Sequence, residues 1–227
     1  MSTPLDSSKY FSDPKLAAFV DDVQHGRVAD VQRAIAGGIN VNAQGTQKFR
    51  PIFFALLPKD TGTLKALLAA GAKADAKLEN GDTPLRTAVL LPTPDYTAVL
   101  LGAGVDPNTR GENDKPAIHD AINAEVPATI RLLAKHGADL NIVWGGDPPL
   151  IAALLSSEWT MATTLLELGA DTTYKDRLGR TAESVFCRQV NRIAPVPKNK
   201  AEIPPLAKAF MGRGVHLSCT AELEKFR

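Results

Sequence analysis

The side chains that most often carry out chemistry are scattered through this chain rather than grouped at a reactive spacing. Its 4 histidines stand far apart, at His25, His119, His136 and His216. No His-x-x-x-His or Cys-x-x-Cys pair offers the spacing of a metal site. Neither a Gly-x-Ser-x-Gly elbow nor a phosphate-binding Gly-Lys-Ser/Thr loop occurs. We therefore predict no catalytic residue, no metal site and no cofactor, and we expect that the chain is not an enzyme.

One segment, Gly145-Gly146-Asp147, is superficially similar to a phosphate-binding loop. Pro148-Pro149 follows it directly and removes N–H donors that a phosphate cradle would use. The enzyme alternative is a lipid or phosphoester hydrolase built from scattered His and Asp side chains. Turnover of generic ester substrates, abolished by changing a His or an Asp, would support that alternative.

A 33-residue period organises most of the chain. Glycines that end helix-like runs are separated by 33, 33, 33 and 32 residues, at Gly38, Gly71, Gly104, Gly137 and Gly169. A second marker keeps the same phase, at Arg50-Pro51-Ile52, Thr83-Pro84-Leu85, Pro116-Ala117-Ile118, Pro148-Pro149-Leu150 and Thr181-Ala182. Such a period is typical of a solenoid, in which each unit buries its apolar face on its neighbours. We predict an all-α solenoid that forms one elongated domain and binds protein.

Each unit is predicted to be a pair of helices. In the third unit Thr83 caps a helix that starts at Pro84, prolines at 92 and 94 end it, and Asp95 opens the second helix. The same phase predicts helices over 14–24, 28–36, 50–57, 61–70, 117–124, 128–135, 150–157 and 161–168. The last unit is longer, and its surplus at 193–200 is predicted to be a loop before a helix over 205–211. A short final helix is predicted over 221–226.

Composition and charge exclude several classes of partner. Hydrophobic residues make up 44% and charged residues 22% of the chain, as in ordinary folded proteins. The formal net charge of +1 gives no electrostatic footprint for nucleic acid. No run reaches the roughly 18 apolar residues of a membrane span. The charge is uneven, however, with a net of −4 over 46–173 and +6 over 174–227. The basic end is either a solvated cap or a contact for an acidic partner surface.

The repeats resemble ankyrin repeats, whose pattern is Thr-Pro-Leu-His-x-Ala followed by a second helix and Leu-Leu-x-x-Gly-Ala-Asp. The closest matches are Pro116-Ala117-Ile118-His119-Asp120-Ala121, Leu132-Leu133-Ala134-Lys135-His136-Gly137-Ala138-Asp139 and Leu165-Leu166-Glu167-Leu168-Gly169-Ala170-Asp171. Arg50 and Arg86 depart from the pattern, where Thr and His are usual. The resemblance implies helix pairs with β-hairpin fingers at right angles. It also implies that His119 ties neighbouring units together by hydrogen bonds.

These observations set the expected boundaries. We place an N-terminal extension at 1–13, an ankyrin-repeat domain of about five to six repeats at 14–217 and a C-terminal tail or cap at 218–227. The approximate repeats are 14–49, 50–82, 83–115, 116–147, 148–180 and 181–217.

A narrower resemblance concerns both ends of the domain. The opening Phe11-Ser12-Asp13-Pro14 and the last unit, which ends at Gly212-Arg213-Gly214-Val215-His216, are similar to bacterial ankyrin immunity proteins. Those proteins are partners of type VI secreted phospholipase effectors. The resemblance implies a monomer that binds a toxin one-to-one and occludes its active site in the periplasm. The alternative is a cytosolic ankyrin scaffold, or a host-directed effector, that binds another protein.

Localisation depends on two features that the sequence leaves open. The first nine residues lack a signal peptide, so we expect a periplasmic protein if a signal peptide was removed and a cytoplasmic one otherwise. The 2 cysteines, Cys187 and Cys219, are 32 residues apart, about one repeat. Stacked units bring such positions close together, so they form either a disulfide or two buried free thiols. A disulfide would favour an oxidising compartment.

Partner contacts are predicted on the fingers and on the exposed ends of the first helices. Two features suggest more than packing there: apolar Leu57, Leu90 and Leu91, and an aromatic residue at a finger tip, Trp144. Trp144 is either an interface anchor or a ring folded against the next unit. The predicted partner-binding residues are Phe49, Lys77, Arg86, Leu90, Arg110, Glu112, Asn113, Asn123, Trp144, Glu158, Lys175 and Arg177.

Overall fold

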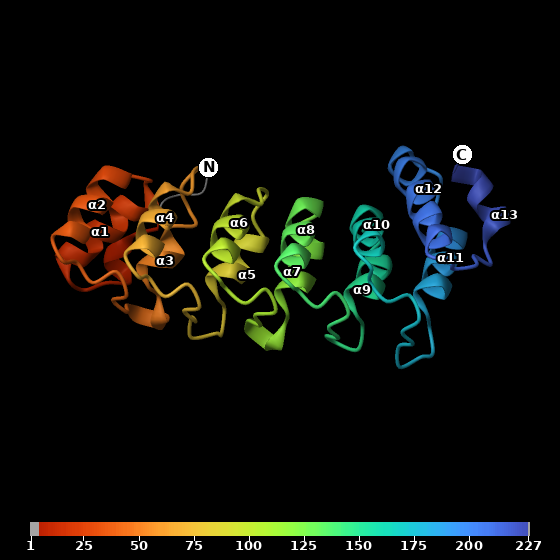
Figure 1. The fold of residues 1–227 in the computed structure, drawn as a ribbon, viewed down its shortest axis with the longest axis horizontal. Coiled ribbons are helices and arrows are strands. Elements are labelled where there is room, and N and C mark those ends of the chain that lie inside the picture. The colour runs from red at the N-terminus through yellow and green to blue at the C-terminus, as the bar shows by residue number, and fades with distance from the viewer. Residues whose placement is uncertain (1–4, 227) are drawn as a thin grey trace. The chain divides into compact units, whose positions relative to one another are not determined.

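A computed structural model describes residues 5–226, so parts of the predicted termini, residues 1–4 and 227, lie outside the described residues (Figure 1). The chain divides into two compact units between Ala117 and Ile118. The secondary structure of the described residues is helical, which confirms the predicted all-α class.

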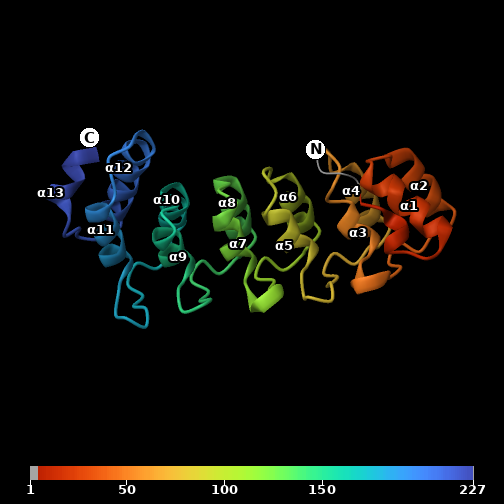
Figure 2. The ribbon, with the colours of Figure 1, turned by 180° about the vertical axis from the view of Figure 1, so that it is seen from behind.

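The first unit consists of short helices in consecutive pairs (Figures 1 and 2). Its elements are η1 (Ser7–Lys9), α1 (Pro14–Gln24), α2 (Val28–Ala36), η2 (Thr46–Lys48), α3 (Pro51–Phe54), α4 (Gly62–Ala69), α5 (Pro84–Val89), α6 (Asp95–Gly102) and η3 (Glu112–Asp114). The predicted bounds of α1 and α2 are confirmed residue for residue.

The second unit repeats the pairing and ends in a longer helix. Its elements are α7 (Ala117–Asn123, starting at the unit boundary), α8 (Pro127–Lys135), α9 (Pro149–Leu155), α10 (Trp159–Glu167), α11 (Ala182–Arg192), α12 (Pro197–Gly212), α13 (Thr220–Leu223) and η4 (Glu224–Phe226). Together α13 and η4 provide the predicted short final helix.

The residues predicted to begin and end helices do so in the structure. The side chain of Thr83 accepts a hydrogen bond from the Arg86 backbone at 3.2 Å, and Pro84 takes the first helical position. Thr181 and Ser184 cap α11 reciprocally. The five marker glycines have φ between 82° and 100°, which is the left-handed conformation that ends a helix.

The prediction for the surplus segment was wrong in part. Residues 197–200 are helical, and α12 runs unbroken through Pro204 and Pro205 instead of starting at Pro205. Each internal proline removes one helical hydrogen bond. Burial of Ile203, Leu206 and Phe210 compensates, because this face of α12 packs against α10.

Aromatic packing and a disulfide hold the end of the second unit. The side chain of Trp159 is 1% exposed and makes an edge contact with Phe186, whose ring centroid lies 5.3 Å from that of Phe210. Cys187 on α11 and Cys219 are joined by a disulfide with a Cα–Cα distance of 5.3 Å. The bond ties the segment after α12 back to α11.

The predicted fingers are tight turns rather than hairpins with strands. Only two isolated β-bridges occur within residues 5–226, Arg110 with Pro116 and Trp144 with Asp147. Each turn is closed by a backbone hydrogen bond from its first N–H to its last carbonyl, at 2.8–3.1 Å. We call these turns the finger loops, and they are residues 45–49, 78–82, 111–115, 144–147 and 176–180. No helix among the described residues has both the length and the apolar character to cross a bilayer.

Candidate functional site

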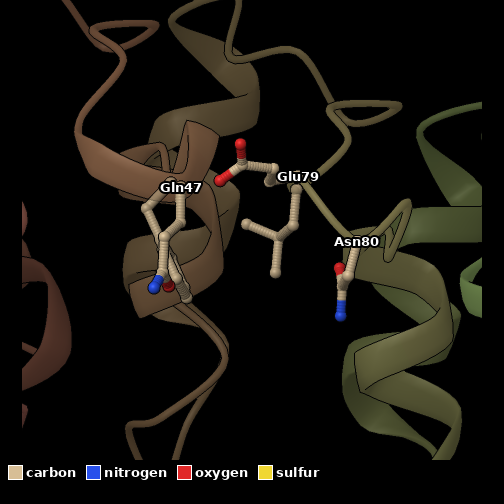
Figure 3. A pocket seen from close by; sticks show the side chains of 5 residues that line it. Gln47, Glu79 and Asn80 are labelled. Atoms are coloured by element: carbon tan, nitrogen blue, oxygen red, sulfur yellow. The ribbon is translucent and has the colours of Figure 1, made fainter.

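A cavity of about 440 Å³ lies between the first two finger loops of the first unit. The loops are joined by a backbone hydrogen bond from the Glu79 N–H to the Gln47 carbonyl at 3.0 Å. Phe49 and Leu78 supply the apolar part of the lining, and Gln47, Glu79 and Asn80 supply the polar part. Figure 3 shows Gln47 on one loop, with Glu79 and Asn80 on the next. A cavity with apolar walls and polar side chains at its edge suits a side chain of a partner protein.

Phe49 is held in place by a cluster of aromatic rings. Its ring centroid lies 4.7 Å from that of Tyr10, 5.8 Å from that of Phe53 and 5.7 Å from that of Phe54. Edge-to-face and tilted contacts of this kind orient rings and stabilise them. Phe49 is half-buried, so it serves the fold while its remaining surface lines the cavity.

Arg86 lies on α5 at the base of the finger loops rather than at their tips. Its side chain is 13% exposed and forms an ion pair with Asp82. The same Asp82 carboxylate accepts a hydrogen bond from the Glu112 N–H at 3.2 Å, so it joins two finger loops. Arg86 therefore positions residues 78–82 and 111–115, and its predicted direct contact with a partner stays a prediction.

The remaining polar residues predicted in the first unit lie in the finger loops or directly before them. Glu112, Asn113 and Lys77 are exposed, and Arg110 donates to the backbone carbonyl and the carboxylate of Asp114 at 3.0 and 2.9 Å. That ion pair is solvent-accessible, so it orients Arg110 more than it stabilises the fold. These side chains can meet a partner without rearrangement of the fold.

Leucine side chains are exposed at or just after the ends of two first helices. Leu57 follows α3 and is 44% exposed, and Leu90 ends α5 and is 50% exposed. The equivalent positions in the second unit are Asn123, 33 residues after Leu90, and Leu155, 32 residues after Asn123 because this repeat is one residue shorter. Asn123 is exposed and polar, and Leu155 is 37% exposed. The exposure predicted for Leu57, Leu90 and Asn123 is confirmed, whereas Leu91 is half-buried rather than exposed.

Trp144 is half-buried against His119. The two ring centroids are 5.7 Å apart, and the Trp144 backbone exchanges both hydrogen bonds of a β-bridge with Asp147. His119 is 4% exposed, with Nε2 located 2.9 Å from the Ile142 carbonyl. The contact with the Ile142 carbonyl agrees with the structural role predicted for His119. Trp144 packs and also keeps exposed surface, so both of its predicted roles remain open.

The last finger loop is organised by a buried carboxylate. Oδ1 of Asp176 accepts hydrogen bonds from the backbone of Leu178 and of Arg180, both at 2.8 Å. Burial alone would raise the pKa of Asp176, but the hydrogen bonds from Arg180 outweigh burial and hold this pKa below its usual value. The predicted residues Lys175 and Arg177 flank Asp176 and are exposed. A Cβ at Gly146 would lie 3.4 Å from Nε of Arg177, so this loop contacts the preceding one.

Glu158 lies at the N-terminus of α10 in acidic surroundings and is half-buried. Burial raises its pKa, and the neighbouring carboxylates of Glu125 and Glu202 raise it further, against the effect of Lys198. Burial also raises the pKa of Asp147, which Arg180 opposes. In both groups burial disfavours the charged form of the carboxyl group.

Sequence reasoning missed two groups of exposed residues in the second unit. Leu178 is 76% exposed at the tip of the last finger loop, where the loops in phase with it carry Gln47, Asn80, Asn113 and Gly145. Arg180, Arg188 and Arg192 line one small cavity. Alignment of the finger loops by phase could have identified Leu178, and the net charge of +6 over 174–227 pointed to the arginines without locating them.

The exposed side chains of the described residues form surfaces that a protein could contact. Across residues 5–226 no group of three or more His, Cys, Asp and Glu side chains has a geometry that could hold a metal ion. Each unit provides finger loops with exposed charges, and the first unit also provides a cavity between two of its loops and exposed leucines nearby in sequence.

Comparison with known proteins supports the repeat assignment. Residues 92–176 match the family of ankyrin repeats in three copies. The fold is similar to the crystal structure of the ankyrin repeat domain of Bcl-3, which is described as a unique member of the IkappaB protein family. That likeness has a TM-score of 0.71 at 23% sequence identity and covers 87% of this chain and 86% of that one. No curated protein matches the chain. The chain thus has an ankyrin-repeat fold, and the narrower resemblance to immunity proteins stays a prediction.

Proposed function

We propose that this chain is a non-catalytic protein-binding ankyrin protein, and more specifically an immunity protein for a secreted phospholipase-type toxin. The single observation that carries the binding function is the exposure of Leu57 and Leu90 at equivalent positions of the first unit. Leucines that are exposed at the same position of successive repeats favour an interaction surface, because exposed apolar patches often mark sites of protein contact. The toxin class comes from the resemblance of the two ends of the domain to bacterial immunity proteins.

Steric occlusion is the mechanism that fits this proposal. The finger loops project side chains of mixed charge, and the cavity at Phe49 and Leu78 can receive one apolar side chain of the toxin. Contacts of this kind bury an interface centre and leave a polar rim. A protein seated over the mouth of an active site excludes substrate without any chemistry of its own.

The periplasm is the proposed compartment. The disulfide between Cys187 and Cys219 supports it, because disulfides persist in oxidising environments and are rare in the cytosol. The same bond disfavours the alternative of a cytosolic scaffold. A host-directed effector that binds another protein is the competing outcome.

The test is co-purification with the protein encoded by the adjacent gene. We expect a one-to-one complex by size exclusion with light scattering, and loss of the neighbour's phospholipase activity in proportion to the complex formed. The neighbour alone, and the neighbour with an unrelated ankyrin protein, are the controls. A complex that keeps full activity would contradict occlusion, and no complex would favour the scaffold or effector function.

Two predicted contacts can be tested in the same complex. Trp144→Ala together with Arg110→Ala should weaken binding at least about tenfold if both side chains touch the toxin. Unchanged affinity in this double variant, with a folded protein by circular dichroism, would make the site assignment wrong.

A further inference from the structure

Three arginines converge on one cavity of the second unit. Arg180 ends finger loop 176–180, and Arg188 and Arg192 lie one turn apart on α11. The cavity has a volume of about 210 Å³ and is lined by Leu155, Arg180, Val185, Arg188, Gln189 and Arg192. None of the lining residues carries a negative charge.

The surrounding carboxylates leave two of these arginines without a partner. Asp176, whose side chain is 2% exposed, accepts from Nε of Arg180 at 2.5 Å and from two backbone N–H groups. Asp147 interacts electrostatically with Arg180, and Glu183 on α11 accepts hydrogen bonds from Ser218. Within residues 5–226 no carboxylate forms an ion pair with Arg188 or Arg192. Like charges one helical turn apart repel each other, so this end of α11 favours a negative charge from outside.

The cavity wall is partly apolar and is held in place. Leu155 is 37% exposed at the end of α9, and Val185 is buried. Nε2 of Gln189 donates to the carbonyl of Leu155 at 3.3 Å, which fixes α11 against the end of α9. A carboxylate that enters such a site is less screened by water than at an open surface, so its hydrogen bonds to a guanidinium are stronger.

We infer that this cavity receives an Asp or Glu side chain from a loop or helix of the partner protein, with an apolar neighbour of that side chain packed on Leu155. Guanidinium groups bind carboxylates in a planar, two-pronged geometry. The inference rests on the proposed protein-binding function and adds the chemistry of the partner segment. The basic end of the chain is then a contact surface rather than a solvated cap.

A protein segment fits these observations better than a nucleic acid or a small molecule. The net charge of the chain is only +1, and nucleic-acid binders need an extended basic surface. A volume of about 210 Å³ is also below the roughly 300–1,000 Å³ of typical small-molecule sites. An acidic side chain next to an apolar one matches both the charge and the exposed leucine.

A peptide titration tests the site without an identified partner. The probe is a blocked Glu-Leu-Glu tripeptide, the matched control is Gln-Leu-Gln, and both are followed by NMR of the arginine Nε–H groups. We expect saturable shifts at Arg188 and Arg192 with the acidic peptide and at least about tenfold weaker binding of the amide peptide. Equal binding of both peptides, no localised shift, or tighter binding of inorganic phosphate or a short oligonucleotide would overturn the inference.

Charge-neutral variants test it in the full complex. Arg188→Gln with Arg192→Gln should weaken binding of the adjacent-gene protein at least about tenfold and reduce its salt dependence. Lys200→Gln with Lys208→Gln, at exposed positions of α12, removes the same charge and should change affinity less than about threefold. If the complex forms and the arginine variant binds as well as wild type, this inference fails and the proposed function stands. If no complex forms, the proposed function fails and the peptide titration still decides the inference.

Discussion

The two units share one backbone plan but present different chemistry at equivalent positions. In the first unit the ends of the first helices expose Leu57 and Leu90, and in the second unit the same phase carries Asn123 and then Leu155, which lies on the wall of the arginine cavity. The second unit instead gathers arginine side chains around one cavity. This difference shows that the repeat determines which positions are exposed but does not determine which residue type occupies them. We read the first unit as an apolar contact surface and the second as a charged one.

The units also differ in what holds their outer ends. Aromatic rings around Phe54 pack the beginning of the first unit, whereas a disulfide closes the end of the second. Removal of the disulfide should have the largest effect on stability. Cys187→Ser with Cys219→Ser should lower the free energy of unfolding by about 3 kcal/mol, because the chain between the two positions regains freedom in the unfolded state.

Urea unfolding followed by circular dichroism measures that loss, and reductant should have no effect on the double variant. Hydrogen exchange then measures how the loss of the disulfide affects each unit separately. Amides of α11 to α13 should lose protection while those of α1 to α4 keep it. Equal loss of amide protection in both units would show that the disulfide supports the whole chain. That result would contradict the proposed difference between the two units.

Partner binding should depend more strongly on the apolar positions of the first unit. Leu57→Asp with Leu90→Asp should raise the Kd of the complex at least about 30-fold, since two half-exposed leucines can contribute about 2 kcal/mol by burial. The matched variant Asn123→Asp with Ser156→Asp adds the same charge in the second unit and should change Kd less than about threefold. Calorimetry measures both, and melting temperatures should stay unchanged. Similar losses in the two variants would mean that charge, not lost apolar contact, weakens binding.

Trp144 allows packing and recognition to be separated. Trp144→Ala should lower the free energy of unfolding by about 1 kcal/mol, because the ring contact with His119 is lost. Trp144→Phe should keep most of that contact and serves as the control. We also expect a rise in Kd of at least about tenfold in the alanine variant. A stability loss with an unchanged Kd would assign Trp144 to packing alone.

The smallest expected effect concerns Glu158. Because its folded-state pKa is raised by burial and nearby carboxylates, its contribution to stability is full below the unfolded pKa and is lost as pH rises through the folded pKa. Glu158→Gln should therefore raise the melting temperature at pH 7. The gain should correspond to less than about 1 kcal/mol, because the group is partly solvated. The difference from wild type should vanish below about pH 4. A gain that is the same at both pH values would show that charge is not its cause.

Much of the fold could be predicted because local signals and the repeat agree. The bounds of α1 and α2, the Thr83 cap and the left-handed marker glycines all follow from residue types in phase. The start of α12 could not be predicted, since Pro205 reads as a helix start. Only tertiary burial of Ile203 and Phe210 shows that the helix continues through it.

The site was less predictable than the fold. Phase placed Leu90, Asn123 and the finger loops at exposed positions, because exposure follows from the repeat. The repeat phase could not show that Arg86 forms an ion pair with Asp82 or that Trp144 packs on His119. These contacts depend on the directions of individual side chains. The pairing of Cys187 with Cys219 was left open for the same reason.

The tip of the first finger loop has a backbone conformation that its residue types disfavour. Gln47 and Lys48 have φ of 53° and 62°, a left-handed conformation that residues with a side chain adopt at a cost. Glycine at these positions would keep the loop geometry without that cost. The chain instead gives up stability to carry two long polar side chains at the tip, one of which lines the cavity at Phe49. Strained backbone of this kind is typical of binding sites, so the tip of this loop is a place where stability is given up at residues that a partner can contact.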